Sequence, residues 1–70
     1  MKTIIRVLRG RKGRISKWFV EVDNVDGRRL VEVDGNKFWN NKDHAITASR
    51  KWAEQNGEKA TFVFPSRDGV

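Results

Sequence analysis

The sequence predicts an α+β fold in which a single amphipathic helix covers one face of a small antiparallel sheet. Two observations carry this prediction: three segments rich in β-branched or alternating apolar residues come first, and a segment with apolar residues at spacings of three and four follows them. A short apolar segment then completes the order β-β-β-α-β. A chain of 70 residues has room for one core, so we expect one compact domain over residues 1–65 and a loose tail over residues 66–70.

The three N-terminal strands are predicted from residue type and alternation. Residues 3–9 are rich in β-branched side chains and stop at Gly10. Residues 17–23 alternate between the two faces of a strand, and residues 28–34 alternate again after Asp26-Gly27, a dipeptide typical of hairpin turns. The short links between these segments indicate an antiparallel meander.

One register of the first strand is favoured because it keeps a charge out of the core. With Ile5 and Val7 facing inward, Arg6 faces outward, whereas the opposite register would bury the guanidinium. The other expected core residues are Trp18, Val20, Val22, Val31, Val33, Ile46, Trp52, and one or both of Phe62 and Phe64.

The helix is predicted between two end signals. Asn40 or Asn41 can cap its N-terminus, and Asn56-Gly57 supplies the residue best suited to the left-handed position that ends many helices. One face of this helix is formed by Ala45, Ile46, Ser49, Trp52 and Ala53. Residues 60–64 form a fourth short strand, which Pro65 ends because it lacks a backbone N–H for the ladder.

Positive charge is concentrated near the N-terminus. The chain carries 15 Lys and Arg against 9 Asp and Glu, a formal net charge of +6. Residues 1–17 hold seven of the bases and no acid. Such a patch repels itself unless an anionic partner neutralises it, and phosphate backbone is the commonest such partner. We therefore expect a small nucleic-acid-binding protein that is not an enzyme, with DNA favoured and RNA as a variant of the same function.

The expected nucleic-acid contacts lie in the loop between the first two strands and at the next hairpin end. They are Arg9, Arg11, Lys12, Arg14, Lys17, Trp18, Arg28 and Arg29. Binding would be mostly electrostatic, because this many bases offer more phosphate contacts than contacts with base edges. A basic loop that serves only solubility is the alternative interpretation.

A second candidate surface is the sheet face that the helix leaves uncovered. Its large apolar members are Ile4, Leu8, Phe19 and Leu30. Trp39 is expected to turn outward as well, because its neighbour Phe38 is expected to turn inward; the alternative is that Trp39 folds back on the edge of the sheet. Exposed apolar clusters are unusual on a monomer, so the alternative function is a protein-protein interaction module or inhibitor that docks onto a host protein. Long arginine stems that cover this face are the other interpretation, and we expect a monomer or a weak homodimer.

A succession of short motifs runs from Arg9 to Ala53. It comprises Arg9-Gly10-Arg11-Lys12-Gly13-Arg14, Lys17-Trp18-Phe19-Val20-Glu21-Val22, Asp26-Gly27-Arg28-Arg29, then Gly35 and Phe38 ahead of residues 42–53. This succession resembles the three-stranded-sheet-plus-helix DNA-binding domains of integrase N-termini and plant ethylene-response factors. The resemblance implies DNA contacts from Arg11, Arg14, Trp18 and Arg28, packing roles for Phe38, Ala45 and Ala48, and an origin in a phage or mobile element.

The second half of the chain carries another pattern. Phe38, Lys42 and Ala45 are followed by Asn56-Gly57, Phe62-Val63-Phe64 and Arg67-Asp68-Gly69. This pattern resembles a family of small bacterial domains of unassigned function, which have a strand, a helix, a strand and an Asp-Gly ending. The resemblance accounts for the fourth strand and implies no chemistry.

Residue types needed for catalysis or metal binding are scarce. The chain has one histidine, His44, and no cysteine, so we expect no metal site, no cofactor and no disulfide. Its serines lack a visible base, and no phosphate-cradling loop or dinucleotide fingerprint occurs, so we expect no enzyme activity. The longest apolar runs are far too short to cross a bilayer, which favours a soluble, cytoplasmic protein with no membrane partner.

Overall fold

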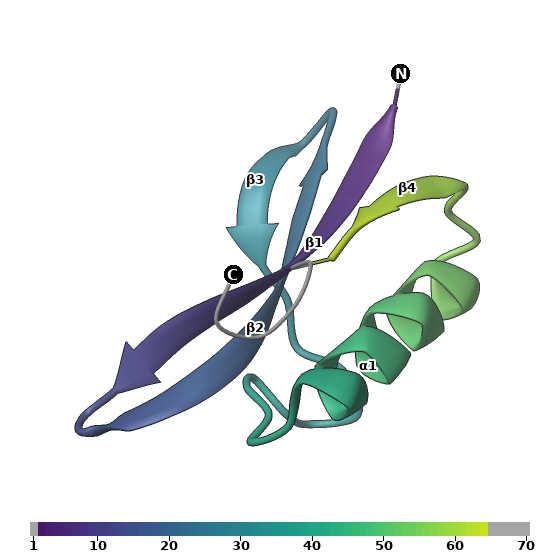
Figure 1. Cartoon of the computed structure of the whole chain (residues 1–70). Helices are drawn as coiled ribbons and strands as arrows, with labels where there is room; N and C mark the ends of the chain where they lie inside the picture. Colours follow the sequence, from purple (N-terminus) through teal and green to yellow (C-terminus); the bar gives the residue numbers. More distant parts are fainter. Residues whose placement is uncertain (1, 65–70) are drawn as a thin grey trace.

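Four strands and one helix follow one another in the predicted order in the computed structural model, which describes residues 2–64 (Figure 1). The strands are β1 (Thr3–Lys12), β2 (Ile15–Asn24), β3 (Gly27–Leu30) and β4 (Ala60–Val63), and the helix is α1 (Lys42–Gln55). The α+β class and the β-β-β-α-β order are confirmed. The predicted tail over residues 66–70 lies outside the described residues.

The four strands form one mixed sheet in the order β3-β2-β1-β4. β1 pairs antiparallel with β2, and β2 pairs antiparallel with β3, as the meander predicts. β4, however, pairs parallel with β1, so the prediction of an entirely antiparallel sheet is wrong for this strand. The reason is the connection: a parallel neighbour needs a crossover of a dozen or more residues, and α1 supplies it.

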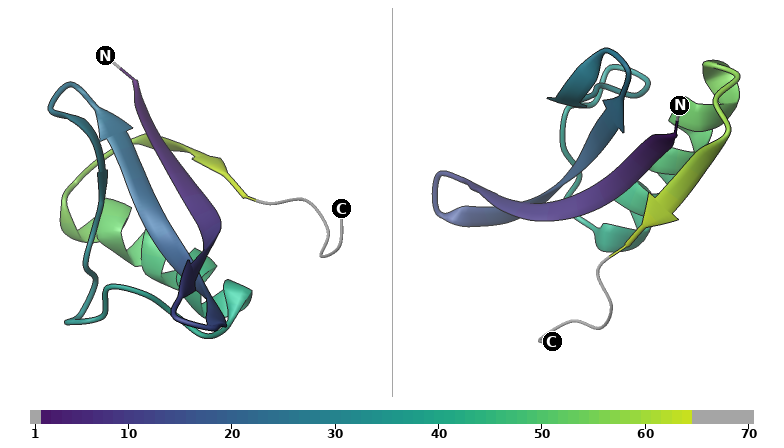
Figure 2. Two further views of the ribbon diagram at one scale, coloured as in Figure 1. Left: turned by 90° about the vertical axis from the view of Figure 1, so that its left-hand side faces the viewer. Right: turned by 90° about the horizontal axis from the view of Figure 1, so that it is seen from above.

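The core lies between α1 and one face of the sheet (Figure 2). Ile5, Val7, Val20 and Val22 are buried on that face, which confirms the register that leaves Arg6 outside. The other buried hydrophobic residues are Val33, Ala45, Ala48, Trp52 and Ala53, while Val31 and Phe62 pack against them half-buried.

Two residues expected in the core lie outside it. Trp18 is half-buried because it stands opposite Arg9, beyond the last buried pair, Val7 and Val20. Ile46 is half-buried as well, since the buried face of α1 runs along Ala45, Ala48, Ser49, Trp52 and Ala53 and leaves it to one side.

β3 ends at Leu30 rather than continuing to residue 34. The cause is a tight turn: Val33 and Asn36 exchange two backbone hydrogen bonds of 3.0 Å around Asp34 and Gly35. Both central residues have positive φ, 53° and 82°, as the commonest two-residue hairpin turn requires. This turn includes residues 33 and 34, which the sequence pattern predicts as the end of the strand.

After the turn the chain returns to β2 at Trp39. Trp18 and Trp39 exchange backbone hydrogen bonds of 2.8 and 2.9 Å. Residues directly opposite in an antiparallel pair share a face, so Trp39 lies on the α1 side and packs against the core. Phe38 instead contacts Phe19 on the uncovered face. The prediction of an inward Phe38 and an outward Trp39 is therefore wrong, and the alternative, in which Trp39 folds back on the edge of the sheet, agrees with its pairing with Trp18.

The predicted end signals of the helix are confirmed. The Asn41 side chain accepts a 2.8 Å hydrogen bond from the Asp43 backbone N–H, and Gly57 has a φ of 63° just after the C-cap. Within residues 2–64, α1 is neither long enough nor apolar enough to cross a membrane.

Candidate nucleic-acid interface

Residues 9–18 form a two-stranded ribbon that extends the sheet past its edge strands (Figures 1 and 2). β4 pairs with residues 3–6 of β1, and β3 pairs with residues 21–24 of β2. Beyond these segments the ladder runs from Arg9 opposite Trp18 to Lys12 opposite Ile15. We call residues 9–18 the basic ribbon. Its base is held by the Trp18–Trp39 backbone pair.

The tip of the basic ribbon is closed by two residues. Gly13 and Arg14 connect Lys12 to Ile15, and Gly13 has a φ of 67°. Glycine at the first position of a two-residue turn allows the backbone twist that matches the twist of the two strands. The turn therefore leaves Arg14 exposed at the end of the ribbon.

The arginines of the basic ribbon are exposed to solvent. Arg9 and Arg11, two residues apart on β1, project from the same face, which is the face of Trp18. Arg9 donates a 3.5 Å hydrogen bond to the Ser16 hydroxyl. Among the described residues, no carboxylate pairs with Arg9, Arg11 or Arg14, and residues 9–18 contain no acid. Lys12 contributes its backbone to the ladder.

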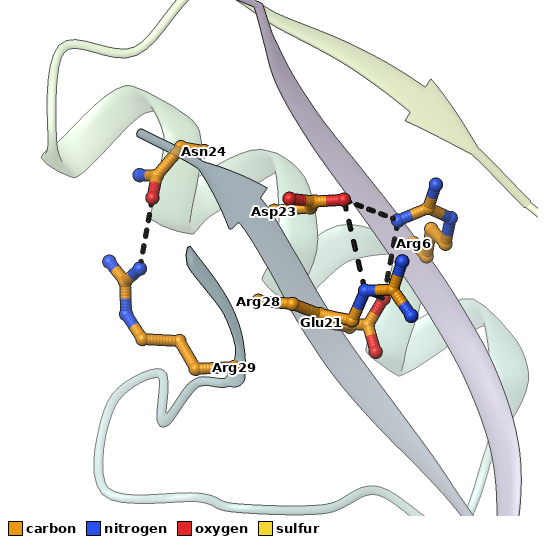
Figure 3. Close-up of polar contacts among 6 residues, drawn as sticks. All are labelled: Arg6, Glu21, Asp23, Asn24, Arg28 and Arg29. Atoms are coloured by element: carbon orange, nitrogen blue, oxygen red, sulfur yellow. Dashed lines mark hydrogen bonds and ion pairs between the residues drawn. The ribbon is translucent and has the colours of Figure 1, made fainter. Parts of the chain in front are cut away.

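Arg28 lies in a different electrostatic setting (Figure 3). Its Nε is 3.8 Å from Glu21 Oε1 and 3.8 Å from Asp23 Oδ2. The Nη1 of Arg6 lies 3.2 and 3.5 Å from the same two carboxylate oxygens. Two guanidinium groups thus balance two carboxylates, and the Glu21 side chain is only 13% exposed. We call these four residues the ion-pair network.

The two groups of predicted contacts lie at opposite ends of β2. A ten-residue strand spans about 30 Å at its usual rise per residue. Arg29 donates a 3.1 Å hydrogen bond to Asn24 Oδ1 at the end far from the ribbon tip. The structure therefore brings together Arg9, Arg11, Arg14, Lys17 and Trp18, and it leaves Arg28 and Arg29 apart from them.

The uncovered face of the sheet mixes apolar and charged side chains. Its predicted apolar members are all there: Leu8 and Leu30 are exposed, while Ile4 and Phe19 are half-buried. The ion-pair network lies among them, because Arg6 stands between Ile4 and Leu8 on β1, and Glu21 stands opposite Leu30. Arg6 thus separates Ile4 from the other three, whereas Leu8 stands opposite Phe19, and Phe19 and Leu30 line the same pocket.

An aromatic pair beside the basic ribbon was not predicted. The rings of Phe19 and Phe38 lie 6.3 Å apart at 58°, and the Lys17 Nζ lies 5.4 Å from the centre of the Phe38 ring. Lys17 also donates a hydrogen bond to Asn40 Oδ1. A pocket of about 430 Å³ opens here, lined by Phe19, Leu30, Val31, Glu32, Lys37 and Phe38. The sequence does carry a signal for this pair, because Phe38 and Trp39 are neighbours and must point to opposite faces. That signal places Phe38 beside Phe19 only once the pairing of Trp39 with Trp18 is known.

No family model, curated protein or solved structure matches this chain. The resemblance to sheet-plus-helix DNA-binding domains therefore stays a prediction, and the candidate interface is argued from its geometry and charge.

Proposed function

We propose that this chain binds nucleic acid through the basic ribbon and that duplex DNA is its preferred partner. One observation carries the proposal: a protruding two-stranded ribbon has exposed Arg9, Arg11 and Arg14, with no carboxylate paired to them in the described residues. Elsewhere on the sheet, Arg6 and Arg28 are balanced by Glu21 and Asp23. Residues 9–18 carry five bases and no acid, so the net positive charge is concentrated in the part of the fold that projects.

The shape of the ribbon suits a duplex groove. The major groove of B-form DNA is about 12 Å wide and admits a two-stranded β-ribbon. Arg9 and Arg11 project from one face of the ribbon, Arg14 is at its tip, and Lys17 belongs to the other face. A ribbon in the groove would therefore present cations to the phosphates of both walls, which is the main source of affinity.

Duplex RNA fits this geometry less well. The major groove of an A-form helix is deep and narrow, and side chains cannot read it. A ribbon with its cations on both faces and at its tip would contact only the outer phosphates of such a helix. We therefore place RNA second to DNA.

The test is a titration of fluorescently labelled duplex DNA with two charge-matched double variants. Arg11→Ala with Arg14→Ala removes two charges from the ribbon, while Lys2→Ala with Lys59→Ala removes two exposed charges elsewhere. The ribbon variant should bind at least about tenfold more weakly, and its salt dependence should become shallower by about two counterions. The control variant should stay close to the wild type.

Each other outcome speaks against the proposal. Equal losses in the two variants would show attraction by net charge alone, without a role for the ribbon. Absence of binding at low salt would point to the alternative function, in which the uncovered face docks onto a protein.

A further inference from the structure

The pocket between Phe19 and Phe38 touches the basic ribbon directly. Phe19 stands on β2 beside the ribbon, and its ring covers Gly10, a ribbon residue: a Cβ atom on Gly10 would lie 2.8 Å from Phe19 Cε2. Phe38 forms another wall, 6.3 Å away between ring centres. Both rings are half-buried, so each is held by its neighbours and still reaches solvent. The pocket lies on the same face of the sheet as Lys17, opposite to the face of Arg9 and Arg11, so a nucleic-acid strand on the Lys17 face of the ribbon would lie next to it.

The lining combines apolar walls with charged groups. Phe19, Leu30, Val31 and Phe38 supply the apolar surface, and its volume of about 430 Å³ falls in the range of small-ligand sites. Lys37 lines the pocket, and the Lys17 ammonium lies 5.4 Å from the Phe38 ring centre. A nucleobase is a planar aromatic group with a phosphate on each side, and it fits a site in which aromatic rings stand near ammonium groups, with Lys17 over the Phe38 ring and Lys37 in the lining.

We infer that this pocket receives one unstacked nucleobase from the nucleic acid that the basic ribbon holds, an inference that rests on the proposed function. The base would pack against the Phe19 and Phe38 rings, and the flanking phosphates would face Lys17 and Lys37. Base stacking on aromatic side chains stabilises such contacts and tolerates every base, because every base has a π-face.

Glu32 adds a preference among the bases. It is exposed and lines the pocket, and its carboxylate can only accept hydrogen bonds at neutral pH. Adenine, cytosine and guanine carry an exocyclic amino group that can donate to it, whereas thymine carries none. The pocket should therefore favour an unpaired adenine over an unpaired thymine.

The test compares two labelled duplexes that differ by one unpaired adenine in the middle of one strand. The wild-type chain should bind the bulged duplex about tenfold more tightly than the paired one. Phe38→Leu removes the ring and keeps an apolar side chain, so it should abolish this ratio. Phe64→Leu is the matched control, because Phe64 is also a half-buried phenylalanine but packs against Phe62 and Arg50. It should keep the ratio.

A third duplex, with an unpaired thymine, provides a test that does not depend on the variants being folded. It is measured with the wild-type chain alone. The bulged adenine should be bound several-fold more tightly than the bulged thymine.

A wild-type ratio of one between bulged and paired duplexes, with the paired duplex still bound, would overturn the nucleobase pocket and leave the ribbon proposal standing. Loss of the ratio in both phenylalanine variants would also overturn it. Failure to bind any duplex would overturn the proposed function and the pocket together.

Discussion

A Cβ atom built on Gly10 would lie 2.8 Å from Cε2 of Phe19, so the Phe19 ring occupies the space directly above the Gly10 backbone. Gly10 is not among the glycines with positive φ, so its backbone is one that other residues adopt. Glycine is needed here for close approach rather than for conformation. The contact fixes the aromatic ring at the base of the basic ribbon.

Gly10→Ala should lower the free energy of unfolding by about 1 kcal/mol, because the added methyl group must displace a ring that is packed against Phe38. Urea denaturation of the two proteins measures this difference. In a Phe19→Ala background the same change should cost nothing, since the obstructing ring is gone. Equal effects of Gly10→Ala in both backgrounds would show that the ring contact is not the cause.

Glu21→Gln should destabilise the fold by about 1–2 kcal/mol, because it leaves Arg6 and Arg28 with the single carboxylate of Asp23. The Glu21 side chain is 13% exposed, so water replaces the lost partner poorly. Glu54→Gln makes the same change of charge at an exposed helix position and is the control. If the two variants unfold at the same urea concentration, the ion-pair network contributes nothing specific.

Asp34 and Lys51 form an exposed ion pair, and the pKa values of both side chains should depart measurably from their ordinary values. A hydrogen bond from Lys51, at 2.6 Å, lowers the pKa of the Asp34 carboxyl, with a smaller contribution from Gln55. The same bond raises the pKa of the Lys51 ammonium. The stabilisation linked to Asp34 is therefore present above the ordinary aspartate pKa, and it is lost as the pH falls through the lowered pKa. The stabilisation linked to Lys51 is present below the ordinary lysine pKa, and it is lost as the pH rises through the raised pKa.

NMR titration of the Asp34 carboxyl tests this directly. In Lys51→Met the pKa of Asp34 should rise toward its ordinary value, whereas Lys59→Met should leave it unchanged. An unaltered Asp34 pKa in Lys51→Met would show that the pair does not form in solution.

The parts of the fold that the sequence predicts are those decided locally. The register of β1 follows from the cost of burying Arg6, and the ends of α1 follow from Asn41 and Gly57. Alternation alone placed Val20 and Val22 in the core. Each of these features depends on a side chain and its near neighbours in the chain.

The features that the sequence did not predict depend on pairings between distant segments. Nothing local shows that β4 lies parallel to β1, or that Trp39 pairs with Trp18 and so directs Phe38 to the opposite face. The same holds for the candidate site. The charge of the ribbon is visible in the sequence, but the pairing of Arg28 with two carboxylates, and its distance from the ribbon tip, require the sheet register.

The basic ribbon as a nucleic-acid interface is tested most directly by the salt dependence of duplex DNA binding by the wild-type chain. If each of the five basic residues from Arg9 to Lys17 neutralises one phosphate, the plot of log K against log salt concentration has a slope of about −4.5. A slope near that value supports the ribbon as the interface. A slope near zero, or no binding at low salt, contradicts it.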